Sequence, residues 1–294
     1  MYKLTIYFNY LYNGGYRLYM KKTLEYLYSK KVNKIPITML TAYDFPTARF
    51  EDEAGIDSVL VGDSVGTNVL GYASEQEVTM GDMLHHLGAV RRGVKDAYLI
   101  VDMPFKSADD PFTACQNAAL MIDKGADCVK VEGWSEKKNV IAYLTENGIS
   151  VCAHIGYNPQ IHGSKPQVFG KDPQQALDLV ESASVLEAAG AVLIVVEKVP
   201  REITGLIASR VKVPVIGIGS GESCDGQVLV VNDILGTDER SFRHAKKFMD
   251  YRNLVLQAIT GYKTEVEKRS FPAEENFQHV DQKLVESVMA SLAL

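Results

Sequence analysis

The chain of 294 residues is long enough for one large α/β domain or for two domains of ordinary size. Hydrophobic residues make up 46% and charged residues 23%, which is typical of a globular protein and excludes extensive disorder. The net charge of −6 and the lack of a Lys/Arg run argue against nucleic acid as a partner. No apolar run reaches the ~20 residues that span a bilayer, so no membrane association is expected.

Four cysteines, Cys115, Cys128, Cys152 and Cys224, are scattered through apolar segments. None belongs to a CxxC pair, so a zinc knot is not expected. Their scatter suits buried thiols in a reducing compartment, and we therefore expect a cytoplasmic protein.

Residues 1–22 are rich in Tyr and Asn and lack the apolar region and cleavage site of a signal peptide. A short β-hairpin around Asn13-Gly14-Gly15 is one interpretation. The other is an upstream extension with Met20 as the effective start, which we favour because compact α/β structure is expected to begin only near Lys34. We expect residues 1–22 to be peripheral and residues 23–294 to form a single catalytic domain with helices at its C-terminal end.

From residue 36 onward, short β-branched runs bounded by Gly, Pro or Asp alternate with segments of helical spacing. This pattern predicts buried parallel strands covered by helices. Asp110-Pro111 and Asp172-Pro173 supply an N-cap and first-turn proline for two of the helices. The expected strands lie within residues 37–44, 58–64, 98–105, 128–133, 150–156, 192–199, 213–221 and 227–236.

Eight strands in a chain of this length fit an α/β fold of the (β/α)₈ TIM-barrel type. An open doubly wound sheet is the alternative, but it would usually carry a glycine-rich phosphate loop after its first strand. The segment after the first expected strand, residues 41–55, contains no such loop. Residues from 241 onward predict a long amphipathic helix and a shorter one, which could close the barrel or join subunits.

Five successive strands deliver an ionisable residue near their C-terminal ends. In a barrel these ends converge on one mouth, where active sites lie. A buried carboxylate at a strand end is costly unless something pairs with it, so the five residues predict one shared site. They are Asp63, Asp102, Glu132, His154 and Glu197.

Two Asp and one Glu without thiolates suit a hard divalent ion such as Mg²⁺. Such an ion acidifies a C–H beside a carbonyl, and Glu197 could then take the proton. Lys130 alternates with Glu132 on one strand, so both side chains point to the same face. Its ammonium would suit a substrate carboxylate.

Each residue taken alone has a plainer interpretation. An Asp after a strand, such as Asp63 or Asp102, is commonly a turn or cap residue, Glu132 could be a surface charge, and His154 a satisfied core histidine. Residues 217–221, "GIGSG", could bind a phosphate or simply form a tight barrel turn.

A set of motifs in fixed order resembles the ketopantoate hydroxymethyltransferase family. The resemblance runs from about Met20 to about Phe277. It rests on "TAYD", "LVGDSVG", "VTMGDMLHHLGAVRRG", "VDMPF", "VKVEG", "CAHIGYNPQ", "EKVP", "PVIGIGSG", "DGQVLV" and "DILG".

The resemblance implies a (β/α)₈ barrel with Mg²⁺ that transfers a one-carbon unit from 5,10-methylenetetrahydrofolate to 3-methyl-2-oxobutanoate through an enolate. The product, 2-dehydropantoate, leads to pantothenate and coenzyme A. The resemblance further implies a homo-oligomer, often a decamer.

The same resemblance implies a role for each matching residue. Asp63 and Asp102 match the metal ligands, and Glu132 matches an acid that supports the metal site through its water shell. Ser64 and Lys130 match groups that hold the substrate carboxylate. His154 matches a residue near the incoming hydroxymethyl group, and Glu197 matches the base.

Three positions depart from the family pattern. Phe169 stands where Gln is common, and Tyr72 and Glu77 stand where His and Pro are expected. We expect these changes to alter loop closure or the folate contacts, because the strand-end residues are unchanged.

Two rival functions are weighed against this one. A barrel enzyme of the phosphoenolpyruvate mutase and isocitrate lyase type would also use strand-end carboxylates and Mg²⁺, but the Lys-Lys-Cys-Gly-His loop of the lyases is absent from the sequence. A non-catalytic barrel kept for binding or assembly would be expected to lose some of the strand-end acids, and all are present.

Overall fold

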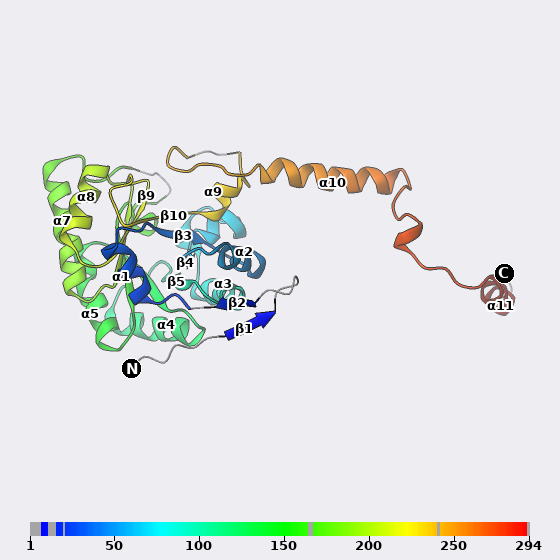
Figure 1. Cartoon of the computed structure of the whole chain (residues 1–294), viewed down its shortest axis with the longest axis horizontal. Coiled ribbons are helices and arrows are strands. Elements are labelled where there is room, and N and C mark those ends of the chain that lie inside the picture. Colours follow the sequence, from blue (N-terminus) through cyan, green and yellow to red (C-terminus); the bar gives the residue numbers. More distant parts are fainter. Residues whose placement is uncertain (1–6, 11–15, 20, 164–166, 240–241, 293–294) are drawn as a thin grey trace. The chain divides into compact units, whose positions relative to one another are not determined.

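The computed structural model describes residues 7–10, 16–19, 21–163, 167–239 and 242–292 (Figure 1). The chain divides into two compact units. The first comprises Met1–Ile234 and Ser241–Lys246, and the second Leu235–Arg240 and Lys247–Leu294. The C-terminal helices form a compact unit separate from that of the barrel. The single domain expected over residues 23–294 stays a prediction.

Eight parallel strands close into a barrel in the order β10-β3-β4-β5-β6-β7-β8-β9, so the predicted (β/α)₈ fold is confirmed. Seven lie within the segments expected from the sequence, and β10 begins at Gly226, one residue before the expected segment 227–236. The strands are β3 (Ile37–Thr41), β4 (Ser58–Val61), β5 (Tyr98–Asp102), β6 (Cys128–Glu132), β7 (Val151–Gly156), β8 (Leu193–Glu197), β9 (Val215–Ile218) and β10 (Gly226–Leu229).

Helices alternate with most of the strands and cover the outside of the barrel (Figure 1). Residues 219–225 join β9 to β10 as a loop instead. The helices of the first unit are α1 (Leu24–Val32), α2 (Phe45–Ala54), α3 (Met80–Gly93), α4 (Pro111–Asp123), α5 (Lys138–Glu146), α6 (Pro159–His162), α7 (Pro173–Ala188) and α8 (Arg201–Arg210). Short turns are η1 (Gly66–Leu70), η2 (Glu75–Glu77) and η3 (Ser135–Lys137), and α9 (Val231–Leu235) runs into the second unit.

The predicted helix caps are confirmed. The carboxylate of Asp110 accepts a hydrogen bond from the Thr113 N–H at 3.0 Å, and Pro111 is the first residue of α4. Asp172 caps α7 in the same way, through the Gln175 N–H at 3.0 Å. These side chains satisfy backbone donors that the first turn of a helix leaves free, and they fix where each helix leaves its loop.

Strands β1 (Tyr7–Tyr10) and β2 (Tyr16–Tyr19) pair in antiparallel fashion, with Tyr7 opposite Tyr19. This antiparallel pairing agrees with the hairpin interpretation of the N-terminal stretch. The expected turn at residues 13–15 lies outside the described residues.

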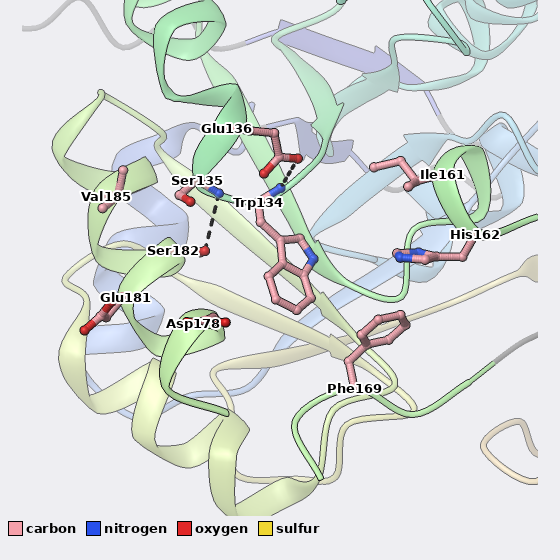
Figure 2. Close-up of a pocket in the computed structure, with 10 residues that line it drawn as sticks. All are labelled: Trp134, Ser135, Glu136, Ile161, His162, Phe169, Asp178, Glu181, Ser182 and Val185. Atoms are coloured by element: carbon pink, nitrogen blue, oxygen red, sulfur yellow. Dashed lines mark hydrogen bonds between the residues drawn. The ribbon is translucent and has the colours of Figure 1, made fainter. Parts of the chain in front are cut away.

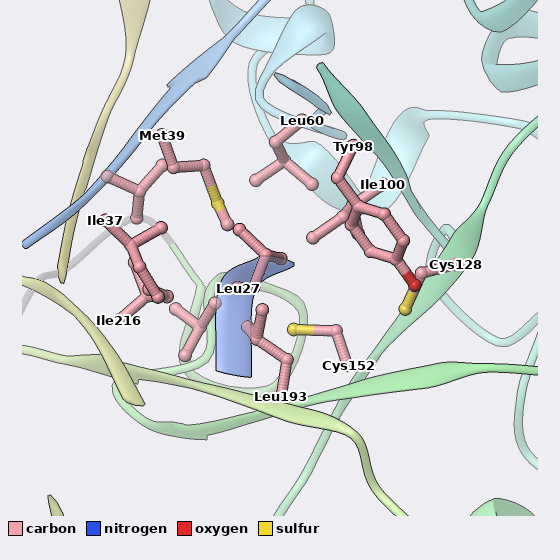
Figure 3. Packing of buried hydrophobic residues seen from close by; sticks show 12 residues of the cluster. Leu27, Ile37, Met39, Leu60, Tyr98, Ile100, Cys128, Cys152, Leu193 and Ile216 are labelled. Atoms are coloured by element: carbon pink, nitrogen blue, oxygen red, sulfur yellow. The ribbon is translucent and has the colours of Figure 1, made fainter. Parts of the chain in front are cut away.

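Helix α1 closes the end of the barrel at which the strands begin. Figure 3 shows Leu27 at the centre of a cluster of inward-facing strand residues, among them Ile37, Leu60, Ile100 and Ile216. Leu27 is fully buried, as are Cys128 and Cys152, so these two predicted buried thiols are confirmed. Compact structure therefore begins at α1, before the expected Lys34, because α1 supplies the apolar side chain that fills this end.

Three lysines near α1 pair with three aspartates that precede barrel strands. Lys31 lies 2.7 Å from Asp225, Lys21 lies 2.5 Å from Asp127, and Lys30 pairs with Asp57. Burial alone would raise the pKa of Asp57, but hydrogen bonds from Lys30 and other donors lower it. Each of these carboxylates has its own ammonium, so this end of the barrel is electrostatically balanced.

The second unit contains α10 (Tyr251–Glu267), η4 (Glu274–Asn276) and α11 (Gln282–Leu292). Among its described residues, neither α10 nor α11 buries a side chain. Large apolar residues such as Ile259, Leu284 and Val288 are therefore exposed on both helices.

Across the described part of the chain, no helix has the length and apolar character needed to cross a bilayer.

Replacing Leu27 by Ala should lower the free energy of unfolding by about 2–5 kcal/mol, because it leaves a cavity in a closed core. Urea denaturation followed by circular dichroism would measure the change. Leu206→Ala is the matched control, since Leu206 on α8 is 56% exposed and should cost less than about 0.5 kcal/mol. Equal effects of the two variants would contradict the role given to α1.

Glu51 on α2 is 5% exposed, and neither of its carboxyl oxygens has a hydrogen-bond partner within the described part of the chain. Burial raises the pKa of Glu51 to about 9, with a further contribution from Asp44. The unfolded chain loses this proton near pH 4.5, whereas the folded chain keeps it to about pH 9. Stability is therefore lost as pH rises through this window.

We expect Glu51→Gln to raise the free energy of unfolding at pH 7 by about 2–3 kcal/mol, and by little at pH 4. Urea denaturation at both pH values would measure the difference. Glu53→Gln, an exposed neighbour on the same helix, should leave the pH dependence unchanged. A Glu51→Gln variant with the pH dependence of the parent would show that Glu51 ionises freely.

Candidate active site

The five predicted strand-end residues converge at the carboxyl end of the barrel. Asp102, Glu132 and Glu197 are the last residues of β5, β6 and β8. His154 lies in β7 opposite Glu132, and Asp63 follows β4 by two residues. Parallel strands bring these positions together because all their carboxyl ends open on one mouth.

Lys130 is the shared cation of this mouth. Its Nζ atom lies 2.8 Å from Asp102 Oδ1, 3.4 Å from Glu132 Oε1 and 3.4 Å from His154 Nδ1. Burial alone would lower the pKa of Lys130, but the surrounding carboxylates outweigh burial and raise it well above its usual value. The side chain therefore stays an ammonium inside the barrel.

His154 connects the acid of β6 to that of β8. Its Nδ1 lies 3.0 Å from Glu132 Oε1, and its Nε2 lies 3.5 Å from Glu197 Oε2. Burial and Lys130 would lower the pKa of His154, but the two carboxylates outweigh them and raise it. The imidazole is therefore held with its Nε2 edge toward Glu197.

Asp63 lies on the other side of Asp102. The Asp63 N–H donates to Asp102 Oδ2 at 2.9 Å, and the Gln160 side-chain amide donates to Asp63 Oδ2 at 2.6 Å. Gly62 permits this packing, because a Cβ there would lie 2.8 Å from Ser64 Oγ. Burial raises the pKa of Asp63 well above its usual value, and the charges of Asp102 and Glu132 add to the effect.

Glu132 shows the opposite shift within the same cluster. Burial would raise its pKa, but Lys130 and His154 outweigh burial and lower the pKa of Glu132 to about 2. Within the buried cluster the negative charge is therefore stabilised at Glu132 and disfavoured at Asp63. Three carboxyl groups, those of Asp63, Asp102 and Glu132, share Lys130 here, in contrast to the separate Lys–Asp pairs at the other end of the barrel.

This donor set fits a hard divalent cation. A carboxylate that is destabilised by burial and like charges gains most from a bound cation. Within the described residues, no three His, Cys, Asp or Glu side chains are grouped so that all could bind one ion. Mg²⁺ does not need such a cage, because it keeps several waters and takes one or two carboxylates. Asp63 and Asp102 are the adjacent pair that fits this role, and Glu132 lies beyond Lys130.

Ser64 lies beside the cluster in a chain of hydroxyl groups. Ser64 Oγ is 2.8 Å from Tyr43 Oη, which accepts a hydrogen bond from Thr41 Oγ1 at 2.9 Å. Tyr43 is buried at the end of the loop that leaves β3. Tyr43 thus orients the Ser64 hydroxyl through this hydrogen bond. The sequence analysis did not single out Tyr43.

The sequence analysis also did not identify Gln160 and Lys198 as residues of the site. Gln160, in α6, donates from its amide to Asp63 and to Met103 O at 2.9 Å, and its N–H donates to Glu132 Oε2 at 3.2 Å. Lys198 Nζ lies 3.8 Å from Glu197 Oε1 and 4.5 Å from the centroid of the Tyr157 ring. A search of the strand ends for amides and hydroxyls as well as ionisable groups would have found Tyr43 and Gln160.

Two of the unusual sequence features have local explanations. Glu77 caps η2, since its Oε1 accepts hydrogen bonds from the N–H groups of Ala73 and Ser74 at 2.9 and 3.0 Å.

In the "GIGSG" segment, Ser220 Oγ donates to Val196 O at 2.8 Å and accepts from the Val199 N–H at 3.2 Å. The contacts observed for this segment are those of a tight barrel turn.

Solved structures with the same fold define the class of protein. A phosphonopyruvate hydrolase, in complex with oxalate and Mg²⁺, has a TM-score of 0.59 at 14% identity and covers 94% of this chain and 100% of its own. A 2,3-dimethylmalate lyase, a member of the phosphoenolpyruvate mutase/isocitrate lyase superfamily, has a TM-score of 0.55 at 13% identity, covering 93% of this chain and 100% of its own. At this identity the likeness establishes the (β/α)₈ barrel and nothing finer.

Sequence comparison gives the family. Residues 21–274 match the model of ketopantoate hydroxymethyltransferase. The 3-methyl-2-oxobutanoate hydroxymethyltransferase of Dehalococcoides mccartyi is 46% identical over 92% of this chain and 97% of the relative. That of Caldivirga maquilingensis is 41% identical over 88% and 98%. The chain belongs to the ketopantoate hydroxymethyltransferase family, so the predicted family and enzyme class, a one-carbon transferase, are confirmed.

Replacing Gln160 by Ala removes the donor to Asp63 and leaves the buried Met103 carbonyl unpaired. We expect the free energy of unfolding without added metal to fall by about 1–3 kcal/mol. Urea denaturation would measure it, with Gln174→Ala as control, because Gln174 is exposed and its side-chain amide donates only to Asp178, one turn further along α7. A loss no greater than that of the control would show that Gln160 does not hold the cluster together.

Proposed function

We propose that the protein transfers a hydroxymethyl group to 3-methyl-2-oxobutanoate and so makes 2-dehydropantoate for pantothenate and coenzyme A synthesis. The proposed one-carbon donor is 5,10-methylenetetrahydrofolate, and the proposed metal is Mg²⁺. Family membership supports the reaction. The observation that carries the proposal is the buried mouth in which Asp63, Asp102, Glu132 and Glu197 surround Lys130 and His154.

Lys130 and Ser64 are the proposed partners of the substrate carboxylate. The ammonium of Lys130 is already fixed by Asp102 and Glu132, so binding an anion requires little further ordering of its side chain. The hydroxyl of Ser64 is held by Tyr43 and can donate to an oxygen of the same substrate. An α-oxo acid would thereby be oriented with its oxo group toward Asp63 and Asp102.

Asp63 and Asp102 are the proposed direct ligands of the metal ion, and Glu132 supports the site beyond them. When bound, a divalent ion supplies Lewis acidity to the oxygens of the oxo acid and acidifies the neighbouring C–H bond. The Gln160 amide and the Asp63 N–H keep the two carboxylates in place.

Glu197 is the proposed base that removes the proton from C3 of 3-methyl-2-oxobutanoate. Its carboxylate is partly exposed at the mouth and lies 3.5 Å from His154 Nε2 and 3.8 Å from Lys198 Nζ. Two nitrogen groups therefore hold the carboxylate in position. Water opens the methylene bridge of the folate: its oxygen bonds to the methylene carbon, both carbon–nitrogen bonds break, and tetrahydrofolate leaves a one-carbon aldehyde near His154. The C3 carbanion, delocalised as an enolate, forms the carbon–carbon bond to that aldehyde carbon, and the proton held by Glu197 passes to the aldehyde oxygen, which becomes the hydroxyl of the hydroxymethyl group.

The assembly and the location of the protein belong to the same proposal. The exposed apolar residues of α10 and α11 support a homo-oligomer, because large apolar side chains on helices are usually covered. We propose a homo-oligomer, with the decamer frequent in the family as its expected size. We propose a cytoplasmic location, which the four free cysteines support.

Deuterium exchange at C3 of 3-methyl-2-oxobutanoate in D₂O, followed by proton NMR, tests this function without folate. We expect exchange that depends on Mg²⁺ and slows by about 10²–10⁴-fold in Glu197→Gln, since the variant lacks the base. Glu202→Gln, five residues further along and exposed, is the control and should exchange at the parent rate. If the parent protein shows no Mg²⁺-dependent exchange, the proposed function is wrong. If Glu197→Gln exchanges at the parent rate, Glu197 is not the base.

A further inference from the structure

A separate cavity lies beside the mouth, between α7 and the loop that follows β7. Its volume is about 420 Å³. Figure 2 shows the Trp134 indole between the α7 residues Asp178, Glu181 and Ser182 and the loop residues His162 and Phe169. The site described above uses none of these residues.

The cavity is anchored to the strand ends that carry the catalytic groups. Trp134 follows Glu132 by two residues, and its Nε1–H donates to the carbonyl of Gly156, the last residue of β7, at 3.1 Å. The Phe169 N–H donates at 3.0 Å to the carbonyl of Lys198, which follows Glu197. The Trp134 side chain and the Phe169 backbone are therefore both fixed to the ends of the strands that carry the catalytic groups.

Three aromatic rings form one wall of the cavity. The ring centroids of Trp134 and Phe169 are 5.8 Å apart in an edge-to-face arrangement, and those of His162 and Phe169 are 4.5 Å apart. The indole N–H of Trp134 is satisfied by Gly156, so the indole offers an apolar face. Phe169 contributes to this wall at the position where Gln is common in the family. Such a wall favours a flat ring that can stack.

Carboxylates line the opposite side. Apart from His162, the charged groups among the described lining residues are Glu136, Asp178 and Glu181. Ionised carboxylates only accept hydrogen bonds, so they select a ligand that presents N–H donors and they disfavour phosphates and other anions. Glu136 Oε1 accepts from the Trp134 backbone N–H at 2.8 Å, and Asp178 Oδ1 accepts from the Gln174 side-chain amide at 2.8 Å. These bonds leave Asp178 Oδ2 and the exposed Glu181 carboxylate as the acceptors on α7.

We propose that this cavity binds the pterin ring of the reduced folate, a planar heterocycle with adjacent ring N–H and amino donors. The ring stacks on the Trp134 indole and contacts Phe169 edge to face, and its donors face Asp178 and Glu181. The inference rests on the proposed function, which requires a folate beside the oxo acid. Two sites joined at one mouth supply the proximity that a reaction between two substrates needs.

Trp134 is the sole tryptophan of the chain, so its fluorescence reports on this cavity alone. The full-length protein would be titrated with 5-formyltetrahydrofolate, which carries the pterin ring without a transferable methylene group. Calorimetry would give the affinity independently. We expect saturable quenching of Trp134 and an affinity about tenfold weaker in both Asp178→Asn and Phe169→Ala, from loss of an acceptor charge and of a stacking ring.

Asp123→Asn is the matched control, since Asp123 is an exposed residue at the end of α4 and should leave the affinity unchanged. Circular dichroism would show that each variant is folded. Calorimetric binding without a change in Trp134 fluorescence, or with parent affinity in both Asp178→Asn and Phe169→Ala, would overturn the assignment. The folate-free exchange at C3 separates the two proposals: exchange by a protein that binds no reduced folate would overturn this inference alone.

Discussion

The pairing of one buried ammonium with several carboxylates is the constraint on which this structure depends. Lys130 lies inside the barrel within 3.4 Å of Asp102, Glu132 and His154, and its charge permits those groups to be buried together. A lone buried ammonium or carboxylate would be costly, and removing either partner would leave the other uncompensated. The strands β5, β6 and β7 must therefore keep their register, because Asp102, Lys130 and His154 meet only in that register.

The two ends of the barrel use the same chemistry for different purposes. Where the strands begin, Asp57, Asp127 and Asp225 each have a lysine of their own. Where the strands end, Asp63, Asp102 and Glu132 share Lys130, and the pKa of Asp63 is raised well above its usual value by burial and by its acidic neighbours. The balanced end stabilises the fold. The unbalanced end retains an unmet demand for positive charge, which is what a site for a divalent ion and an anionic substrate requires.

The loop after β7 contacts both the carboxylate cluster at the strand ends and the second cavity. Gln160 in α6 bonds Asp63 and Glu132, and two residues later His162 lines the cavity beside Trp134 and Phe169. One short helix thus contacts both the proposed metal site and the proposed folate site.

The sequence by itself determined the eight barrel strands, the capped helices and the residues Asp63, Asp102, Glu132, His154 and Glu197. Strand periodicity and strand-end polarity are local signals, and parallel topology alone implies that such ends converge. Only the tertiary structure decided which groups touch. The contacts of Gln160 with Asp63, of Trp134 with Gly156 and of Leu27 with the barrel core join segments that are distant in the chain. No local pattern encodes them, because their distances depend on how the barrel closes and on how the loops fold over its mouth.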